Sequence, residues 1–239
     1  LNKIDFLNVV LIFFITVFSI PLVSMLNLVN LVVLEKIFGR VVVSQPSPAV
    51  NWYTLLLSIF IVGIPPAICE EILFRGTIQR SFERYGAVKS ILITAFLFGL
   101  FHMDFQKLLG TFLLGALIGF IVYRTDSLYG GMVVHFTNNT AAVVLTYLLI
   151  KLNDFISSLD LGENSLDLGD VQGIAENTSI SSIFDMPTPQ LIAVIVFYAF
   201  IFIFCAAIFG ALLYAFIKNT SKSVKPIPAQ NITQAADQD

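Results

Sequence analysis

The sequence predicts an all-α integral membrane bundle of about six transmembrane helices. Of the 239 residues, 57% are apolar and 12% are charged, and the mean hydropathy is +0.88. Water-soluble domains carry about a quarter charged residues, so a globule of this composition would lack the charges needed to cover its surface. The formal net charge of −3 also argues against nucleic acid as a partner, because nucleic-acid-binding domains are typically basic.

Six apolar segments account for this bundle, since a helix needs about 20 mostly apolar residues to cross a bilayer. They lie near 6–34, 53–74, 88–103, 107–124, 127–150 and 190–217. The third and fourth are short and only Asp104-Phe105-Gln106 separates them, so we expect a helical hairpin. We interpret the chain, 1–239, as a single transmembrane domain with a core motif region at 50–150, an acidic extramembrane loop at 151–189 and a polar tail at 218–239.

The distribution of lysine and arginine predicts the orientation, because cytoplasmic loops of membrane proteins carry an excess of both. With six spans, nine of the 13 such residues fall on the side of the two termini and four on the other side. We therefore expect a plasma-membrane protein with cytoplasmic termini and an outward-facing loop at 151–189. The first residue is Leu1 and not Met, so we also expect a trimmed or processed N-terminus.

Ionisable side chains are few inside the apolar segments, where they are costly and by default mark a functional site. Glu70 and Glu71 end the second segment. A spacing of four residues places Glu71 and Arg75 on one helical face, so we expect an ion pair between them. Glu70 points to a different face, which leaves its carboxylate free in apolar surroundings and suited to act as a general base.

The two histidines of the chain both lie in apolar segments. Phe98 and His102 share a face of the third segment, where the ring can brace the imidazole. His135 and Asn139 are four residues apart and project together from the fifth. Each cluster also has a structural interpretation: an ion pair at the membrane edge, a hydrogen-bonded interfacial histidine, and a His/Asn pair that joins helices. Convergence of all three clusters on one cavity would favour a functional interpretation.

The three clusters occur on successive helices in a recognisable order. Glu70-Glu71-Ile72-Leu73-Phe74-Arg75 reads E-E-x-x-x-R, Phe98 to His102 reads F-x-x-x-H, and His135 to Asn139 reads H-x-x-x-N. This ordered set resembles the motifs of the CPBP family, the CAAX proteases and bacteriocin-processing enzymes, also called Abi or type II CAAX prenyl endopeptidase-like. The resemblance covers roughly residues 50–150.

The resemblance implies a multi-helix intramembrane endopeptidase, a hydrolase whose eukaryotic and archaeal members cut the last three residues from prenylated C-terminal tails. The partner that it implies is a peptide or protein C-terminal tail, prenylated in those members, at the lipid bilayer. Carried over to this chain, Glu70 would activate the attacking water with His102 as its partner. His135 and Asn139 would hold the developing oxyanion.

The same resemblance gives the remaining motif residues supporting roles: Glu71 and Arg75 would support the catalytic groups, and Phe98 would brace His102. A second interpretation of this family treats the motif residues as metal ligands. Glu70, His102 and His135 would then bind a Zn²⁺ with an open position for water. Both interpretations require these three side chains to converge, so the spacing leaves the choice between them open.

Two non-enzymatic hypotheses compete with the endopeptidase. A non-catalytic membrane scaffold or bacteriocin self-immunity protein would depend on the acidic loop at 151–189 and tolerate replacement of the motif residues. A small transporter would use the buried histidines and glutamates as a proton relay, but the two halves of the sequence show no hydropathy symmetry of the kind that transporters often have.

Overall fold

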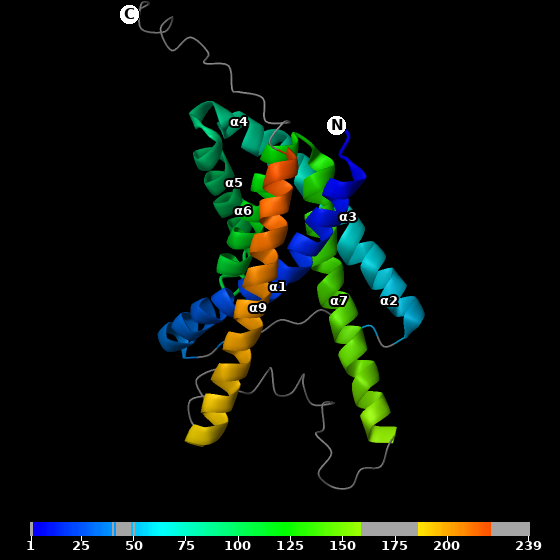
Figure 1. The fold of residues 1–239 in the computed structure, drawn as a ribbon, viewed down its shortest axis with the longest axis vertical. Coiled ribbons are helices and arrows are strands. Elements are labelled where there is room, and N and C mark those ends of the chain that lie inside the picture. Colours follow the sequence, from blue (N-terminus) through cyan, green and yellow to red (C-terminus); the bar gives the residue numbers. More distant parts are fainter. Residues whose placement is uncertain (1, 40, 42–48, 50, 159–185, 221–239) are drawn as a thin grey trace, which may run out of the picture.

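The computed structural model describes residues 2–39, 41, 49, 51–158 and 186–220, and in these residues every regular element is helical. The helices run in alternating directions along the bundle (Figure 1). The elements are α1 (Phe6–Phe38), α2 (Trp52–Ser58), η1 (Ile59–Gly63), α3 (Ile64–Glu71), η2 (Ile72–Gln79), α4 (Arg80–Phe82), η3 (Glu83–Tyr85), α5 (Ala87–Phe101), α6 (Leu108–Thr125), α7 (Leu128–Ser158) and α9 (Thr188–Thr220). The predicted all-α class is confirmed.

Among the described residues, five helical segments are long and apolar enough to cross a membrane: α1, the continuous helix Trp52–Tyr85, α6, α7 and α9. The protein is an integral membrane protein. The third predicted span corresponds to α5, which has only 15 residues and falls short of that length. It forms the predicted hairpin with α6, where the backbones approach closely: a Cβ added at Gly115 would lie 3.1 Å from Ala95 Cα.

The helix Trp52–Tyr85 contains two π-helical stretches, η1 and η2, on either side of the α-helical α3. Pro65 and Pro66 follow Ile64 in the first turn of α3, and neither has a backbone N–H. The carbonyl of Val62 therefore has no α-helical donor at residue 66, and it becomes available to a side chain of another helix.

Helix α7 continues past residue 150 to Ser158, so the beginning of the segment predicted as an acidic loop is helical. Lys151 Nζ lies 2.9 Å from Asp154 Oδ2 on this exposed extension, a spacing that supports a helix in water. The rest of that loop, 159–185, lies outside the described residues. The predicted polar tail at 218–239 begins within α9, which ends at Thr220, and 221–239 also lie outside the described residues.

Helix α1 crosses the bundle obliquely and packs against α6, α7 and α9 (Figure 1). The core at these contacts consists of fully or almost fully buried apolar side chains: Ile12, Ile15, Leu114, Ile118, Ile121, Val122, Val134 and Phe216. Asn219 Nδ2 donates to Asn8 Oδ1 at 2.8 Å, which joins the end of α9 to the beginning of α1. The beginning of α1 and the end of α9 therefore lie on the same side of the bundle.

Candidate active site

Glu71 and Arg75 form the predicted ion pair in the interior of the bundle. Arg75 Nη1 lies 3.1 Å from Glu71 Oε1, and neither side chain is exposed. Arg75 Nη2 donates to Gly115 O of α6 at 2.9 Å, and its Cζ lies 4.5 Å from the centre of the Phe98 ring of α5. A buried charge needs both a counter-charge and hydrogen bonds. Glu71 supplies the counter-charge of Arg75 and Gly115 O accepts a hydrogen bond from it, so Arg75 links the second helix to α6 and, through the Phe98 ring, to α5.

Glu71 also fixes His135 of α7. His135 Nδ1 lies 2.9 Å from Glu71 Oε1, so the oxygen that accepts from Arg75 accepts from the imidazole as well. The other ring nitrogen, Nε2, lies 3.9 Å from Glu70 Oε2. That oxygen is buried and has no hydrogen-bond partner. The two glutamates therefore differ in their partners: Oε1 of Glu71 is bound by Arg75 and His135 while its Oε2 has no hydrogen-bond partner, and the unbonded Oε2 of Glu70 faces His135 Nε2.

His102 and His135 lie against the same aromatic ring. The Phe98 ring centre is 4.8 Å from that of His102 and 5.7 Å from that of His135. His102 Nδ1 lies 2.9 Å from Phe98 O. Because a carbonyl can only accept, Nδ1 carries a proton, and in the neutral imidazole Nε2 is then the acceptor. The predicted contact between Phe98 and His102 is present, and the Phe98 ring contacts both histidines.

Asn139 lies one helical turn beyond His135 on α7, and its amide has a structural partner. Asn139 Nδ2 donates to Val62 O at 3.1 Å, the carbonyl that Pro66 cannot serve. This bond ties α7 to the π-helical turn η1 of the second helix. An amide nitrogen has two hydrogens, so the second hydrogen of Asn139 Nδ2 remains for another acceptor.

Comparison with known proteins adds the family. Residues 51–141 match the family model described as type II CAAX prenyl endopeptidase Rce1-like. Residues 51–141 are thus similar to an Rce1-like domain, and we call them the Rce1-like domain below. The match contains all three motifs, covers less than half of the chain, and is to a family of CAAX-type endopeptidases. Searches of the curated proteins and of the solved structures give no significant match.

The zinc site that the resemblance implies requires Glu70, His102 and His135 to converge on one ion. Within the part of the chain that the structure describes, no group of three or more His, Cys, Asp or Glu side chains is arranged to hold a metal. In the Rce1-like domain, Nδ1 of His102 is held by Phe98 O and Nδ1 of His135 by Glu71, and Nε2 of His135 lies 3.9 Å from Glu70 Oε2. Histidines that bind metals commonly make such bonds through their other nitrogen, so the zinc interpretation stays a prediction, and we derive no step through a metal ion.

Gln79 is a buried member of the Rce1-like domain that the sequence reasoning missed. Its Nε2 donates to Gly119 O at 3.0 Å, and Ser90 Oγ donates to its backbone carbonyl at 2.8 Å. Arg75 and Gln79 are four residues apart, as are their acceptors Gly115 and Gly119 on α6. Glycine leaves the helix carbonyl accessible to such a donor, so the matching i, i+4 pairs were a signal available in the sequence.

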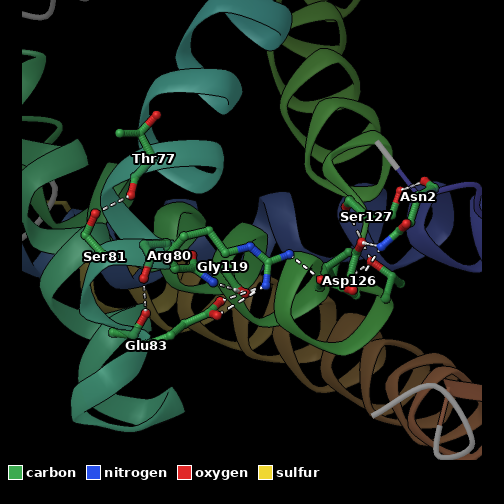
Figure 2. Close-up of polar contacts among 12 residues, drawn as sticks. Asn2, Thr77, Arg80, Ser81, Glu83, Gly119, Asp126 and Ser127 are labelled. Carbon is green, nitrogen blue, oxygen red and sulfur yellow. Dashed lines mark hydrogen bonds and ion pairs between the residues drawn. The ribbon is translucent and has the colours of Figure 1, made fainter. Parts of the chain in front are cut away.

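Arg80 directly follows the buried Gln79 in the sequence and lies at the end of the bundle, where its side chain is partly exposed. It forms ion pairs with Asp126, in the turn between α6 and α7, and with Glu83 (Figure 2). Asn2 Nδ2 donates to Asp126 O at 2.8 Å, and Ser127 Oγ donates to Asn2 O at 2.6 Å. The N-terminal segment, the α6–α7 turn and the second helix are thereby joined outside the apolar core of the Rce1-like domain.

Gly131 of α7 is the position where a side chain would disturb Glu71 most directly. A Cβ there would lie 2.8 Å from Glu71 Oε2 and 2.8 Å from Val122 Cγ2. We expect Gly131→Ala to lower the free energy of unfolding by about 1–3 kcal/mol, because a well-packed interior must shift to accept the methyl group. Thermal unfolding in detergent measures this, and Gly210→Ala is the control, since nothing lies within 4 Å of a Cβ at Gly210. Equal loss in both variants would contradict the close approach at Glu71.

Proposed function

We propose that the protein is an intramembrane endopeptidase of the CAAX-protease type in which Glu70 activates the attacking water. The observation that carries this proposal is the division of labour between the two glutamates. Glu71 is held through its Oε1 by Arg75 and His135, and its Oε2 has no hydrogen-bond partner. Glu70 instead directs its buried, unbonded Oε2 at a histidine nitrogen, His135 Nε2. An unbonded carboxylate oxygen in apolar surroundings is available to take a proton from water.

In the proposed reaction, Glu70 removes a proton from a water molecule, with the free Nε2 of His102 as its partner in holding that water. The resulting hydroxide attacks the carbonyl carbon of the scissile peptide bond, and the carbonyl oxygen becomes an oxyanion. When the C–N bond breaks, the proton held by Glu70 passes to the leaving amine. The oxyanion reforms the C=O bond as the C–N bond breaks, so the products are a carboxylic acid and an amine. Glu70 has then taken one proton from water and given it to the amine, and its carboxylate is regenerated.

The oxyanion is proposed to accept hydrogen bonds from His135 Nε2 and Asn139 Nδ2. Because Glu71 accepts from Nδ1 of His135, donation from Nε2 requires a proton on both ring nitrogens. A protonated His135 and Arg75 would balance the charges of Glu70 and Glu71. The second hydrogen of Asn139 Nδ2, which Val62 O does not use, supplies the other donor. Donors of this kind contribute about 3–4 kcal/mol each to transition-state stabilisation where they have been measured.

An apolar groove beside the site favours a substrate with an apolar portion. The groove has a volume of about 900 Å³ and lies between α1, α3 and α7. Met132 and Phe136 of its wall flank His135 on α7, and Ala67 precedes the glutamates by one turn on α3. We therefore propose a peptide or protein C-terminal tail as the substrate, with a prenyl group or an apolar side chain in the groove.

The proposal is tested by cleavage of prenylated and unmodified C-terminal peptides by the protein purified in detergent. We expect His102→Ala to lower kcat by about 10²–10⁴-fold, the usual contribution of a group that assists proton transfer. We expect a chelator to leave wild-type cleavage unchanged, because the proposed mechanism uses no metal. Zinc in elemental analysis together with chelator-sensitive cleavage would instead favour the Glu70, His102 and His135 metal site. Equal cleavage by wild type and His102→Ala would contradict the proposed mechanism, and no cleavage by wild type would favour a non-catalytic scaffold or a bacteriocin self-immunity protein.

We further propose a location in the plasma membrane with both termini in the cytoplasm. The excess of lysine and arginine on the side of the termini supports this orientation. The bond between Asn8 and Asn219 supports a common side for the two ends. A reporter fused after α9 that is active only outside the cytoplasm should be inactive, and an active reporter would reverse the orientation.

A further inference from the structure

Two of the three asparagines of the apolar helix α1, Asn27 and Asn30, lie toward its C-terminal end, outside the Rce1-like domain. Asn27 and Asn30 are three residues apart, so they share a helix face. The most apolar part of α1 has a mean hydropathy of 2.7, and polar side chains in such a helix are costly unless they find partners. Both side chains are half-buried and point to the turn between α5 and α6.

Asn27 uses both ends of its amide on this turn. Its Nδ2 donates to Gln106 O at 2.9 Å, and its Oδ1 accepts from Gly110 N at 3.0 Å. Gly110 lies in the first turn of α6, where backbone N–H groups have no partner within the helix. Lys107, the residue at the N-cap position, provides no side-chain cap. Asn27 therefore caps α6 from another helix.

Asn30 binds the carbonyl of the preceding residue in the same turn, Phe105. Its Nδ2 donates to Phe105 O at 2.9 Å and lies 3.3 Å from Gln106 O. Carbonyls without a donor are expensive in an apolar environment. The two asparagines thus satisfy consecutive carbonyls of the turn.

The turn that they hold begins at His102. Helix α5 ends at Phe101, and His102 is its C-terminal cap. Met103 follows with φ of 49°, a left-handed conformation that is uncommon for residues other than glycine, and its side chain is 91% exposed. Side-chain packing therefore does not fix the turn at Met103, and its path depends on polar contacts, which include those from α1 and the bond from Gln106 N to Asp104 Oδ1.

We propose that Asn27 is a positioning residue for His102, through the turn that it anchors. The proposal rests on the proposed function for its kinetic consequence, because His102 is there the partner of Glu70. Helix α1 then contributes to the site without contributing a catalytic residue. Misplacement of a catalytic group by about 1 Å can lower a rate by about 10²-fold, so anchoring the turn affects the chemical step more than substrate binding.

A direct measurement follows the two imidazoles. The chain has only two histidines, so ¹⁵N-histidine labelling gives two sets of ring signals, which His102→Gln assigns. We expect Asn27→Leu to shift or broaden the His102 signals and to leave those of His135 in place. The matched control is Asn8→Leu, which removes another asparagine of α1 whose partner, Asn219, lies at the opposite end of the helix from the turn.

The kinetic measurement uses the same variants. We expect Asn27→Leu to lower kcat by about tenfold to a hundredfold with KM within about twofold of wild type, and Asn8→Leu to retain wild-type kcat. If Asn27→Leu does not fold, Asn30→Leu removes the bond to Phe105 O and the longer one to Gln106 O but keeps both bonds of Asn27, and it should give a smaller change in the same direction.

The two proposals fail in different ways. Equal cleavage by wild type and His102→Ala contradicts the proposed function. Unchanged His102 signals in the asparagine variants, in a protein whose cleavage does depend on His102, overturn the positioning role of Asn27. Equal disturbance of His102 by Asn8→Leu also overturns it, because the effect would then reflect a general loosening of α1.

Discussion

Glu70→Gln is expected to lower kcat for peptide cleavage by about 10²–10⁴-fold, the contribution typical of a general base. Glutamine has nearly the shape of glutamate, but its amide cannot take a proton from water at neutral pH. The Glu70 side chain is 22% exposed, and its Oε2 has no hydrogen-bond partner. We therefore expect the fold to tolerate the change, with the midpoint of thermal unfolding within a few degrees of wild type.

The matched control for this prediction is Glu83→Gln, in the same continuous helix. Glu83 lies at the end of the bundle, where it pairs with Arg80 at 3.1 Å, and it is far less buried than Glu71. Both variants remove one carboxylate from one helix, and only Glu70→Gln removes the proposed base. Cleavage by Glu70→Gln at the rate of Glu83→Gln would remove Glu70 from the mechanism.

Arg75→Leu is expected to lower the free energy of unfolding by about 3–5 kcal/mol, the usual cost of leaving a buried charge without its partner. Glu71 would then keep a single buried partner, His135, and Gly115 O would lose its side-chain donor. The stability is measured by thermal or chemical unfolding in detergent. Arg75→Lys keeps the charge but lacks the forked guanidinium, so we expect an intermediate loss.

The control for Arg75 is Arg80→Leu, because the ion pairs of Arg80 are partly exposed. Its side chain is 38% exposed, and pairs of this kind contribute about 0–1 kcal/mol. A loss of stability in Arg75→Leu no larger than that in Arg80→Leu would mean that Glu71 and Arg75 are not coupled in the interior. A second variant, Glu71→Gln with Arg75→Met, should recover part of the stability but not cleavage, because His135 loses its carboxylate.

Contacts within one helix could be predicted from the sequence, whereas contacts between helices could not. The Glu71–Arg75 pair and the Phe98–His102 contact follow from a spacing of four residues. The bond from Glu71 to His135 joins two helices, and spacing along the chain carries no information on their rotation. The sequence therefore predicted only that the three motifs converge, and it did not predict that His135 contacts Glu71.

The role of Asn139 shows a different limit. The sequence predicted that it projects with His135, but its bond to Val62 O depends on the loss of a donor at Pro66. That loss could have been inferred from the two prolines, whereas the helix that would supply the replacement donor could not. Asn27 and Asn30 were visible as polar residues in an apolar span, and their partners again belong to another helix.

The sequence predicted which segments are helical better than it predicted the residues at which the helices begin and end. Hydropathy marks the part of a helix that crosses the apolar layer, and a helix can continue beyond it into water. Helix α7 does so as far as Ser158, supported by the pair between Lys151 and Asp154. Conversely, α5 is apolar but has only 15 residues. It packs against the glycine-rich face of α6, where Gly115 lies close to Ala95.

The local spacing of Glu71 and Arg75 has a consequence for biogenesis. The translocon inserts helices roughly in the order of synthesis, and a charged side chain at the centre of an inserting helix costs about 2.5–3.5 kcal/mol. Because the pair lies within one helix turn, it can form as that helix forms, before α6 and α7 are made. We expect the second helix to enter the bilayer with these two charges already paired. Arg75 would bind Gly115 O, and Glu71 would bind His135, only after α6 and α7 have been inserted.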